Sequence, residues 1–302
     1  PFAPATAEVI KKIIAAVFEP GYVSVFDGEG DVGEQLLRER FDDICFTGGS
    51  RFGHYVMEVA AKHLTPVTLE LGGKSPCIVG RGANVKIAAR RTAWGKFINA
   101  GQTCVAPDYV FVYEDQRAEF VEAVRLAVKR FYGDYPYESP DYPRIVHREG
   151  TERLARLMHS SGQVVVGGEV NVEEKYIAPT VLIDVEADSP IMREEIFGPI
   201  LPVLTYREIP LALYYFGPEQ EAREVLNRTS SGGVCVNDTI VHLANPRLPF
   251  GGVGMSGVGK YHGKASFELF SNLRSVVKSF TFFDNHFRYA PYKHLNLLKK
   301  FM

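Results

Sequence analysis

The sequence predicts an α/β fold in which helices cover a parallel sheet. Helical patterns alternate with short apolar runs through about the first two hundred residues, and this alternation is typical of βαβ units. Glycine-rich turns close several of the apolar runs, as expected where a strand passes into a helix. The chain has 302 residues, of which 46% are hydrophobic and 23% charged, so it is long enough for about two globular domains.

The first helices and strands are predicted from the spacing of apolar residues and from the turn residues between them. Apolar residues between Val9 and Val17 recur at helical spacing, and Glu19-Pro20-Gly21 ends that helix. The next elements in order are a buried strand at 22–26, a helix capped by Asp31 that reaches about Arg40, a strand at 43–46, a helix from the following glycine turn to about His63, and a strand at 67–71.

The second part continues the alternation. It predicts a strand at 75–79, a helix at 84–97, a polar loop, a strand at 109–113 and a helix at 116–131. Later strand-like runs lie at 163–166, 180–185, 200–205, 212–216 and 233–237. The stretch 280–302 is aromatic and contains Lys299-Lys300 near its end. This pattern fits either an arm that packs on the protein or a tail that associates with a surface.

The composition limits the kinds of partner that the protein can bind and indicates its cellular compartment. The formal charge is −2, which argues against nucleic acid as a main partner, and no apolar stretch is long enough for a membrane span. No signal peptide is visible at the N-terminus. The four cysteines show no CxxC and no zinc-like spacing, so we expect no metal site, a reducing environment and a cytoplasmic protein.

The glycine-rich turn from Thr47 to Gly53 is a candidate phosphate site. Glycines let backbone N–H groups approach a ligand closely, and a helix N-terminus favours an anion. The spacing is not GxGxxG, and many strand-to-helix turns contain glycine for structural reasons alone.

Cys104 and Glu70 are candidate catalytic residues. Cys104 lies in a polar, glycine-bearing loop, whereas Cys45, Cys77 and Cys235 lie in apolar runs and are expected to be buried and inert. Glu70 lies at the carboxyl end of a predicted parallel strand, where α/β sheets place their ligands. Burial there would raise its pKa and suit it to act as a base. A buried inert thiol and a Glu70–Lys74 salt bridge are the structural alternatives.

Two further motifs are less specific by themselves. The segment 194–199 offers a carboxylate, Glu195, able to bind ribose hydroxyls, and an aromatic ring, Phe197, able to pack on a flat ring. It reads equally well as a helix end followed by a turn. The glycine-rich segment 249–257 indicates only tight turns.

Taken in order, these motifs resemble the aldehyde dehydrogenase superfamily over essentially the whole chain. The resemblance is carried by Phe46–Gly53, Leu69–Pro76, Gly101–Cys104, Glu194–Pro199 and Pro249–Gly252. Four further segments are similar to the class 3 branch, which includes fatty aldehyde dehydrogenases; they are His63–Thr68, Trp94–Phe97, Asn237–His242 and Tyr261–Lys264.

The resemblance implies roles for the candidate residues. Cys104 would attack the aldehyde to give a thiohemiacetal, hydride would pass to NAD or NADP, and Glu70 would activate the water that hydrolyses the thioester. The backbone N–H of Cys104 would donate to the oxyanion. The implied cofactor-binding residues are Thr47, Gly48, Ser50, Gly53, Leu71, Gly72, Glu195 and Phe197.

The resemblance also implies an architecture. It predicts a partial Rossmann-like cofactor domain over 1–72, an α/β catalytic domain over 73–258 and a C-terminal oligomerisation arm over 259–302. The expected partners are a medium- or long-chain aliphatic or an aromatic aldehyde and a second copy in a homodimer.

Two departures from the family pattern stand out. The family's Asn-Tyr-Pro-Phe and Lys-Pro-Ser motifs are absent, so we expect the chain to begin part-way through the cofactor domain and to lack full activity by itself. A helix expected after Glu208 is also missing, because Ile209 and Pro210 follow at once. A catalytically idle relative and a cofactor-independent esterase that uses Cys104 remain as alternative functions.

Overall fold

The computed structural model describes residues 3–28, 30–206 and 214–279, and the statements below concern these residues. The chain divides into two compact units, Pro1–Leu269 and Phe270–Met302. The described part of the second unit, 270–279, contains no helix or strand. The domain boundaries predicted after residues 72 and 258 both fall inside the first unit and stay predictions. The tail 280–302 and the irregularity after Glu208 lie outside the described residues.

The first helix forms as the periodicity predicts. Helix α1 (Pro4–Val17) carries a proline in its first turn and has no buried residue. Helix α2 (Gly30–Leu36) is shorter than predicted, and Asp31 lies in its first turn instead of capping it. The predicted strand at 22–26 is wrong, because this segment has no strand partner among the described residues. An apolar run becomes a strand only where a neighbour accepts its backbone hydrogen bonds.

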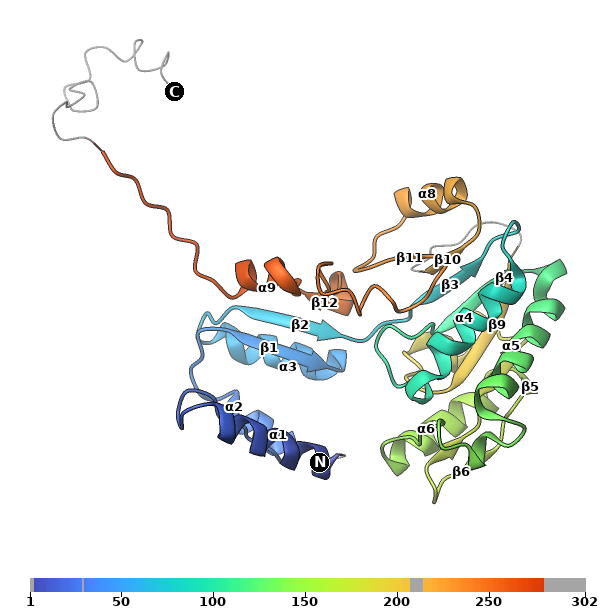
Figure 1. The fold of residues 1–302 in the computed structure, drawn as a ribbon, viewed down its shortest axis with the longest axis horizontal. Coiled ribbons are helices and arrows are strands. Elements are labelled where there is room, and N and C mark those ends of the chain that lie inside the picture. The colour runs from blue at the N-terminus through green and yellow to red at the C-terminus, as the bar shows by residue number, and fades with distance from the viewer. Residues whose placement is uncertain (1–2, 29, 207–213, 280–302) are drawn as a thin grey trace, which may run out of the picture. The chain divides into compact units, whose positions relative to one another are not determined.

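A three-stranded sheet carries the candidate base. It has the order β1–β2–β12, with β1 at Ile44–Gly48, β2 at Val67–Leu71 and β12 at Gly257–Val258. Strands β1 and β2 are parallel and pair Thr47 with Glu70, whereas β12 runs antiparallel and pairs Gly257 with Glu70. Helix α3 (Ser50–Ala61) packs along this sheet (Figure 1).

Side-chain alternation separates the two faces of this sheet. Leu69 and Leu71 pack with Val56 and Val59 of α3 in one apolar cluster. Glu70 lies between the two leucines and therefore points to the opposite face, away from α3. The pleat of β2 thus directs the carboxylate out of the apolar layer and toward the candidate site.

A seven-stranded sheet forms the main core. Its order is β11–β10–β3–β4–β9–β8–β5, and every pair is parallel except β5–β8. The strands are β3 (Pro76–Val79), β4 (Tyr109–Tyr113), β5 (Gln163–Val166), β8 (Thr180–Ile183), β9 (Ile200–Tyr206), β10 (Tyr214–Phe216) and β11 (Cys235–Val236). Its central strands are apolar on both faces, as expected of a parallel sheet covered on both sides.

Helices cover both faces of this sheet. Helices α4 (Val85–Phe97) and α5 (Arg117–Tyr132) pack on one face, against side chains that include Cys77, Val79 and Val110. Helix α8 (Glu219–Asn227) packs on the other face against Ile78. The sequence predicted α4 and α5 to within one residue at each end, and Asn84 caps α4 by accepting a hydrogen bond from the Ile87 N–H.

The remaining elements complete the first unit. They are η1 (Ile98–Gly101), η2 (Glu114–Gln116), η3 (Pro136–Glu138), α6 (Arg148–His159), β6 (Val170–Asn171), β7 (Tyr176–Ile177), α7 (Pro190–Arg193), η4 (Gly254–Ser256) and α9 (Gly263–Leu269). Strands β6 and β7 pair with each other. The sequence prediction did not include α6, although its buried side chains contribute to a second apolar cluster.

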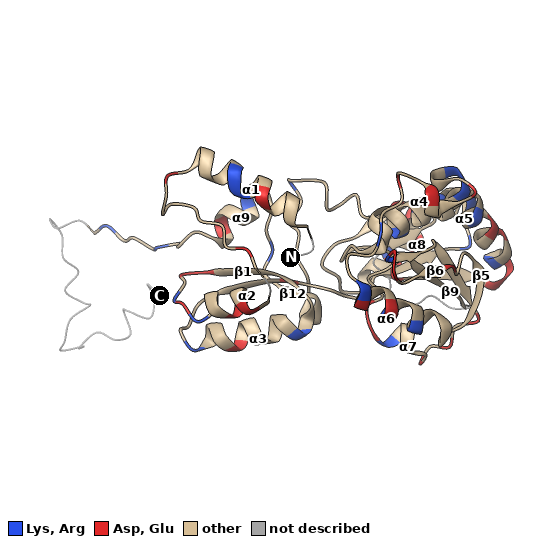
Figure 2. Cartoon of the chain, turned by 90° about the horizontal axis from the view of Figure 1, so that it is seen from below, with Lys and Arg blue, Asp and Glu red and all other residues tan. Residues whose placement is uncertain are grey.

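Charge and chain path complete the description. Both basic and acidic residues occur along α5 and α6 (Figure 2). Within the described part of the chain, no helix is both long and apolar enough to cross a bilayer.

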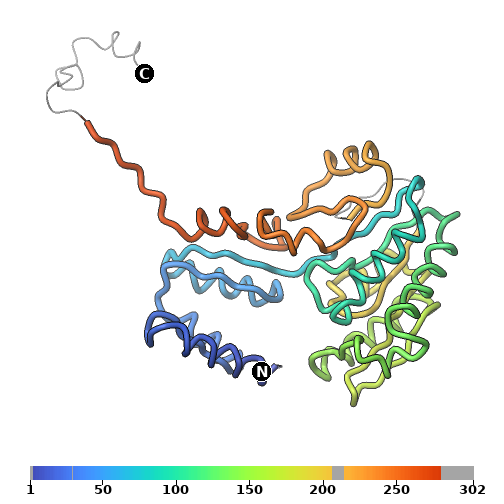
Figure 3. The backbone as a smooth tube through the Cα atoms, viewed as in Figure 1, coloured from blue at the N-terminus to red at the C-terminus, as the bar shows by residue number. Residues whose placement is uncertain are grey.

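The tube in Figure 3 shows the late segment that contains β12 returning to lie beside β2. This return brings residues from opposite parts of the sequence to one site.

Candidate active site

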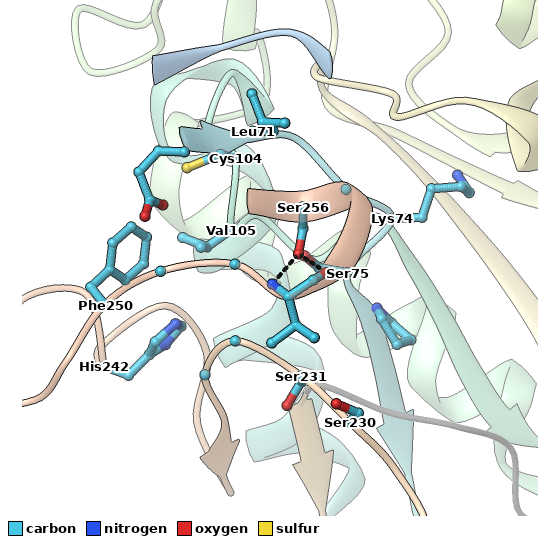
Figure 4. A pocket seen from close by; sticks show the side chains of 18 of the residues that line it. Leu71, Lys74, Ser75, Cys104, Val105, Ser230, Ser231, His242, Phe250 and Ser256 are labelled. Carbon is cyan, nitrogen blue, oxygen red and sulfur yellow. Dashed lines mark hydrogen bonds between the residues drawn. The ribbon is translucent and has the colours of Figure 1, made fainter. Parts of the chain in front are cut away.

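A cavity of about 290 Å³ brings the two catalytic candidates together. Glu70 lies in its wall together with Cys104 and Leu71, and the glycine segments 232–233 and 251–252 form another part of the wall. Figure 4 shows Cys104 and Val105 on one side of this space and the rings of Phe250 and His242 on another. The sequence separates these residues widely, so the cavity exists only in the folded chain.

Left-handed backbone and a buried glutamine shape the loop before Cys104. Asn99, Ala100 and Gly101 all have positive φ values, which turns the chain sharply after α4. The Gln102 side chain is buried and donates to the carbonyl oxygens of Asn99 and Arg144. Its own oxygen accepts a hydrogen bond from the Val146 N–H at 2.9 Å. These hydrogen bonds fix the loop and thereby define the position of Cys104.

The Cys104 thiol is half-buried among acidic groups. Burial raises its pKa, and the charges of Glu195 and Glu70 add to that effect. The backbone N–H groups of Cys104 and Val105 act in the opposite sense by stabilising the thiolate. Tyr214 of β10 donates to the Val105 carbonyl oxygen at 2.6 Å and so ties this turn to the seven-stranded sheet. The thiol therefore needs a base to lose its proton at neutral pH.

Glu70 is buried, with only 7% of the residue exposed. Its Oε1 atom is buried and has no hydrogen-bond partner among the described residues. Burial raises its pKa to about 7, and the charge of Lys260 acts in the opposite direction. A carboxylate with a pKa near 7 suits proton transfer at neutral pH. The alternative Glu70–Lys74 salt bridge does not form, because Lys74 pairs with Asp108.

The segment after α7 carries Glu195 and Phe197. The Glu195 carboxylate accepts a hydrogen bond from the Gly73 N–H, which lowers its pKa, while burial and Asp108 raise it to about 7 overall. A methyl group at Gly72 would overlap the same carboxylate, so glycine is required there for Glu195 to approach β2. Phe197 has a φ of 46° and is 42% exposed. Its ring is therefore available to a ligand.

Buried and partly buried charged side chains anchor this segment. The Lys74 ammonium forms an ion pair with Asp108 and donates to the Glu194 carbonyl oxygen at 3.0 Å. The other Asp108 oxygen accepts from the Ile196 N–H at 3.0 Å. Arg153 of α6 donates to the Ile196 carbonyl oxygen at 2.6 Å. The backbone on both sides of Glu195 is thus held by side chains from three other parts of the chain, the two segments before β3 and β4 and helix α6.

The glycine turn lies where β1 passes into α3. Gly49 is the N-cap residue of α3, and no side chain caps the helix. Gly48 pairs with Leu71 across the sheet, and the Leu71 side chain packs against Gly53. The turn and the end of β2 therefore adjoin each other. Among the predicted cofactor residues, Leu71 also lines the cavity, whereas Thr47, Gly48, Ser50, Gly53, Gly72, Glu195 and Phe197 do not.

Sequence reasoning missed several residues of the site. His242 lines the cavity and contacts the Cys235 sulfur through Nδ1 at 3.2 Å, and burial lowers its pKa. Lys260 donates to carbonyl oxygens of the cavity wall. The glycine-rich pattern at 249–257 was the available signal for this wall. One prediction was wrong, because Cys45 is exposed: the short edge strand β1 leaves its outer face uncovered.

Comparison with known proteins decides the family. The profile described as "Aldehyde dehydrogenase family" matches residues 1–276. The chain belongs to the aldehyde dehydrogenase family. This family membership confirms the resemblance that the ordered motifs indicate.

The sequences of individual relatives support this family membership. It is 46% identical to the rat "Aldehyde dehydrogenase family 3 member B1" over 97% of this chain and 66% of the relative. It is 45% identical to the rat "Aldehyde dehydrogenase, dimeric NADP-preferring" over 94% of this chain and 66% of the relative. The chain thus spans slightly less than two thirds of the length of these relatives.

A solved structure confirms the fold. The substrate-bound state of Staphylococcus aureus AldH matches 99% of this chain and 69% of that chain, with a TM-score of 0.94 and 43% identity. Together with the sheet order, this likeness confirms the predicted α/β, Rossmann-like class for this member of the aldehyde dehydrogenase family.

Proposed function

We propose that the whole protein oxidises an aldehyde to the carboxylic acid and reduces NAD or NADP. The observation that carries this proposal is a single cavity lined by the Cys104 thiol and the Glu70 carboxylate, in a chain that belongs to the aldehyde dehydrogenase family. A thiol nucleophile and a carboxylate base are the two groups that a thioester route needs.

The residues beside the cavity fit a dinucleotide cofactor. The first turn of α3 has no side-chain cap and no acidic residue, so no side chain of the turn competes with a phosphate for the N–H groups of Ser50 and Arg51. We assign Thr47, Gly48, Ser50 and Gly53 to the phosphate side of the cofactor. We assign Leu71, Gly72, Glu195 and Phe197 to the nicotinamide side. When bound, the cofactor supplies the hydride acceptor.

Cys104 acts as the nucleophile in this proposal. Its thiolate attacks the carbonyl carbon, a C–S bond forms, and the Cys104 N–H donates to the oxygen that becomes negative. Because burial, Glu195 and Glu70 raise the pKa of the thiol, proton removal by a neighbouring base is part of the step. Loss of hydride from the resulting thiohemiacetal leaves a thioester on the Cys104 sulfur.

Glu70 serves the second half of the reaction. It accepts a proton from the water that attacks the thioester, the C–S bond breaks, and the acid leaves. Since the pKa of Glu70 is raised to about 7, the carboxylate is ionised above that pH and protonated below it. We therefore expect thioester hydrolysis to accelerate as the pH rises through about 7 and then to level off.

Substitutions in the complete protein test these roles. Cys104→Ala should abolish NAD(P)H formation from aldehyde. Glu70→Gln should retain a first-turnover burst of NAD(P)H while steady-state turnover falls by about 10²–10⁴-fold. Cys45→Ala, which removes an exposed thiol, is the matched control and should retain activity.

Three outcomes would contradict the proposal. Oxidation retained by Cys104→Ala would exclude this nucleophile, and full turnover by Glu70→Gln would exclude this base. Ester hydrolysis without cofactor, in a protein that forms no NAD(P)H, would favour the esterase alternative. Absence of both activities in the complete wild-type protein would favour a catalytically idle relative.

The substrate, the assembly and the location complete the proposal. A medium- or long-chain aliphatic or an aromatic aldehyde suits a cavity whose wall includes Phe250 and Val105. The relative named as dimeric supports a homodimer, and free cysteines are consistent with a cytoplasmic location. Initial rates across an aldehyde chain-length series, with NAD and with NADP, and light scattering of the complete protein test the first two points.

A further inference from the structure

Lys260 lies beside the strand that carries the proposed base. It follows β12, which pairs antiparallel with β2 so that Gly257 is opposite Glu70. Gly259 then packs over Thr68 of β2. The chain therefore runs back along β2 on the side that Glu70 occupies, and from there the Lys260 ammonium reaches the backbone of two glycines that line the cavity.

Two backbone carbonyl groups fix the Lys260 ammonium. It donates to the Gly232 carbonyl oxygen at 2.8 Å and reaches the Gly251 carbonyl oxygen at 3.5 Å. Both glycines line the cavity that contains Glu70 and Cys104. Gly251 also packs against the Lys260 stem. Neutral carbonyl groups hold the ammonium in place without cancelling its charge, and Lys260 forms no ion pair within the described part of the chain.

The charge of Glu70 in turn raises the pKa of three neighbouring groups that are neutral when protonated. They are Cys45 on β1, Cys104 in its loop and Tyr261 next to Lys260. Helix α3 covers the opposite face of the sheet. Among the described residues, Lys260 is the one cation whose charge acts on Glu70, and it opposes the effect of burial.

We propose that Lys260 is a positioning residue that keeps the Glu70 carboxylate ionised near neutral pH from a fixed place on the cavity wall. The inference rests on the proposed function of Glu70 as base. An opposite charge near a buried carboxyl favours its ionised form, and a larger ionised fraction means more active enzyme at a given pH.

Three substitutions in the complete protein separate charge from anchoring. Lys260→Gln removes the charge and keeps a donor for the two carbonyl groups, whereas Lys260→Arg keeps the charge. Lys264→Gln removes a lysine whose side chain is 86% exposed and forms an ion pair with Glu268, so it is the matched control. Thermal unfolding establishes that each variant is folded.

The first measurement is independent of cofactor and turnover. Infrared difference spectra across pH 5–9 follow the protonated carboxyl band of Glu70, which is assigned by its loss in Glu70→Gln. We expect the midpoint to rise by about 0.5–1 pH unit in Lys260→Gln and to stay unchanged in Lys260→Arg and Lys264→Gln. An unchanged midpoint in Lys260→Gln would overturn the inference.

The second measurement is the pH profile of turnover. At pH 6 we expect kcat of Lys260→Gln to fall by about 3–10-fold, while kcat above pH 9 and KM stay unchanged, and high salt should shrink the difference. An equal loss at every pH would mean that Lys260 only supports the backbone, which also overturns the inference. A shifted carboxyl midpoint in a protein that forms no NAD(P)H would uphold Lys260 and reject the proposed function.

Discussion

Single residues set the electrostatic character of this site, and Lys96 is the most unusual of them. Its side chain is 0% exposed and its Nζ atom has no hydrogen-bond partner among the described residues. Burial lowers its pKa to about 8, although Asp108 and Glu195 favour the charged form. An unpaired buried ammonium is costly.

We predict that Lys96→Met stabilises the protein at neutral pH. The folded-state pKa of about 8 lies below the ordinary 10.5, so the unfolded chain binds the proton more tightly. The cost of burying Lys96 is therefore complete below pH 8 and disappears as the pH rises toward 10.5. We expect a gain of about 3 kcal/mol in the free energy of unfolding at pH 7 and almost none at pH 10.5.

Denaturant unfolding at both pH values checks this prediction. Lys86→Met is the matched control, because Lys86 lies on the same helix and is exposed. A loss of stability in Lys96→Met at pH 7 would show that the ammonium has a stabilising partner.

Residue-level prediction from sequence succeeded where local context was informative. Cys104 and Glu70 were found because each lies in a recognisable loop or strand end, and the structure places both in one cavity; their catalytic roles stay predictions. Lys260 and His242 were not found. Their relevance arises from the pairing of β12 with β2 and from the cavity wall, for which the glycine-rich pattern at 249–257 indicated only tight turns.

Among the elements, the loop of η1 and the segment 194–199 depend on each other. Gly101 has a φ of 71°, and a methyl group there would overlap the Gly198 carbonyl oxygen. This close approach places the nucleophile loop directly against the segment that carries Glu195 and Phe197.

We predict that Gly101→Ala damages activity far more than Gly133→Ala. Both glycines have positive φ, at 71° and 80°, but a methyl group at Gly133 meets nothing within 4 Å. Gly133→Ala should cost about 1 kcal/mol from backbone strain alone. Gly101→Ala should also displace the nucleophile loop and lower kcat/KM by about 10²-fold.

Unfolding free energies and steady-state kinetics of the two variants test this contrast. Equal effects would show that strain at positive φ, and not the contact with Gly198, determines the loss. A fully active Gly101→Ala would show that the two segments move independently.

A helix or strand could be predicted from sequence where the residues that determine it lie within its own segment. The strands at 67–71 and 109–113 and the helix at 84–97 were placed correctly, since periodicity, turn residues and the Asn84 cap all lie within the segment. The segment at 22–26 has the same apolar character as these strands. It is not a strand, because backbone pairing depends on a neighbour that the segment itself does not encode.

At the scale of the whole molecule, α1 leaves a large apolar face uncovered. Val9, Ile10, Ile13 and Val17 are all exposed, and α1 has no buried residue. Contiguous exposed apolar surface of this kind favours association with other apolar surfaces. The fold class could be predicted from the sequence. The exposure of one apolar face of α1 could not.

We predict that the 302-residue chain binds the dye ANS through this face and self-associates. The double variant Ile10→Glu with Ile13→Lys should bind less dye and elute as a smaller species, because the substitutions place charges on the apolar stripe. Lys12→Gln, on the polar side of the same helix, is the control. Fluorescence titration and size-exclusion chromatography with light scattering measure both effects, and equal dye binding by all forms would contradict the prediction.

The pairing of β12 with β2 has a consequence for biosynthesis. Glu70 and Cys104 leave the ribosome well before β12 and Lys260, which lie more than 150 residues after Cys104 in the sequence. At roughly 5–20 residues per second, the nascent chain spends on the order of ten seconds with its base and thiol translated but its cavity wall absent. Until the late segment arrives and docks, the ribosome-bound chain lacks the enclosed space in which this thiol can react selectively.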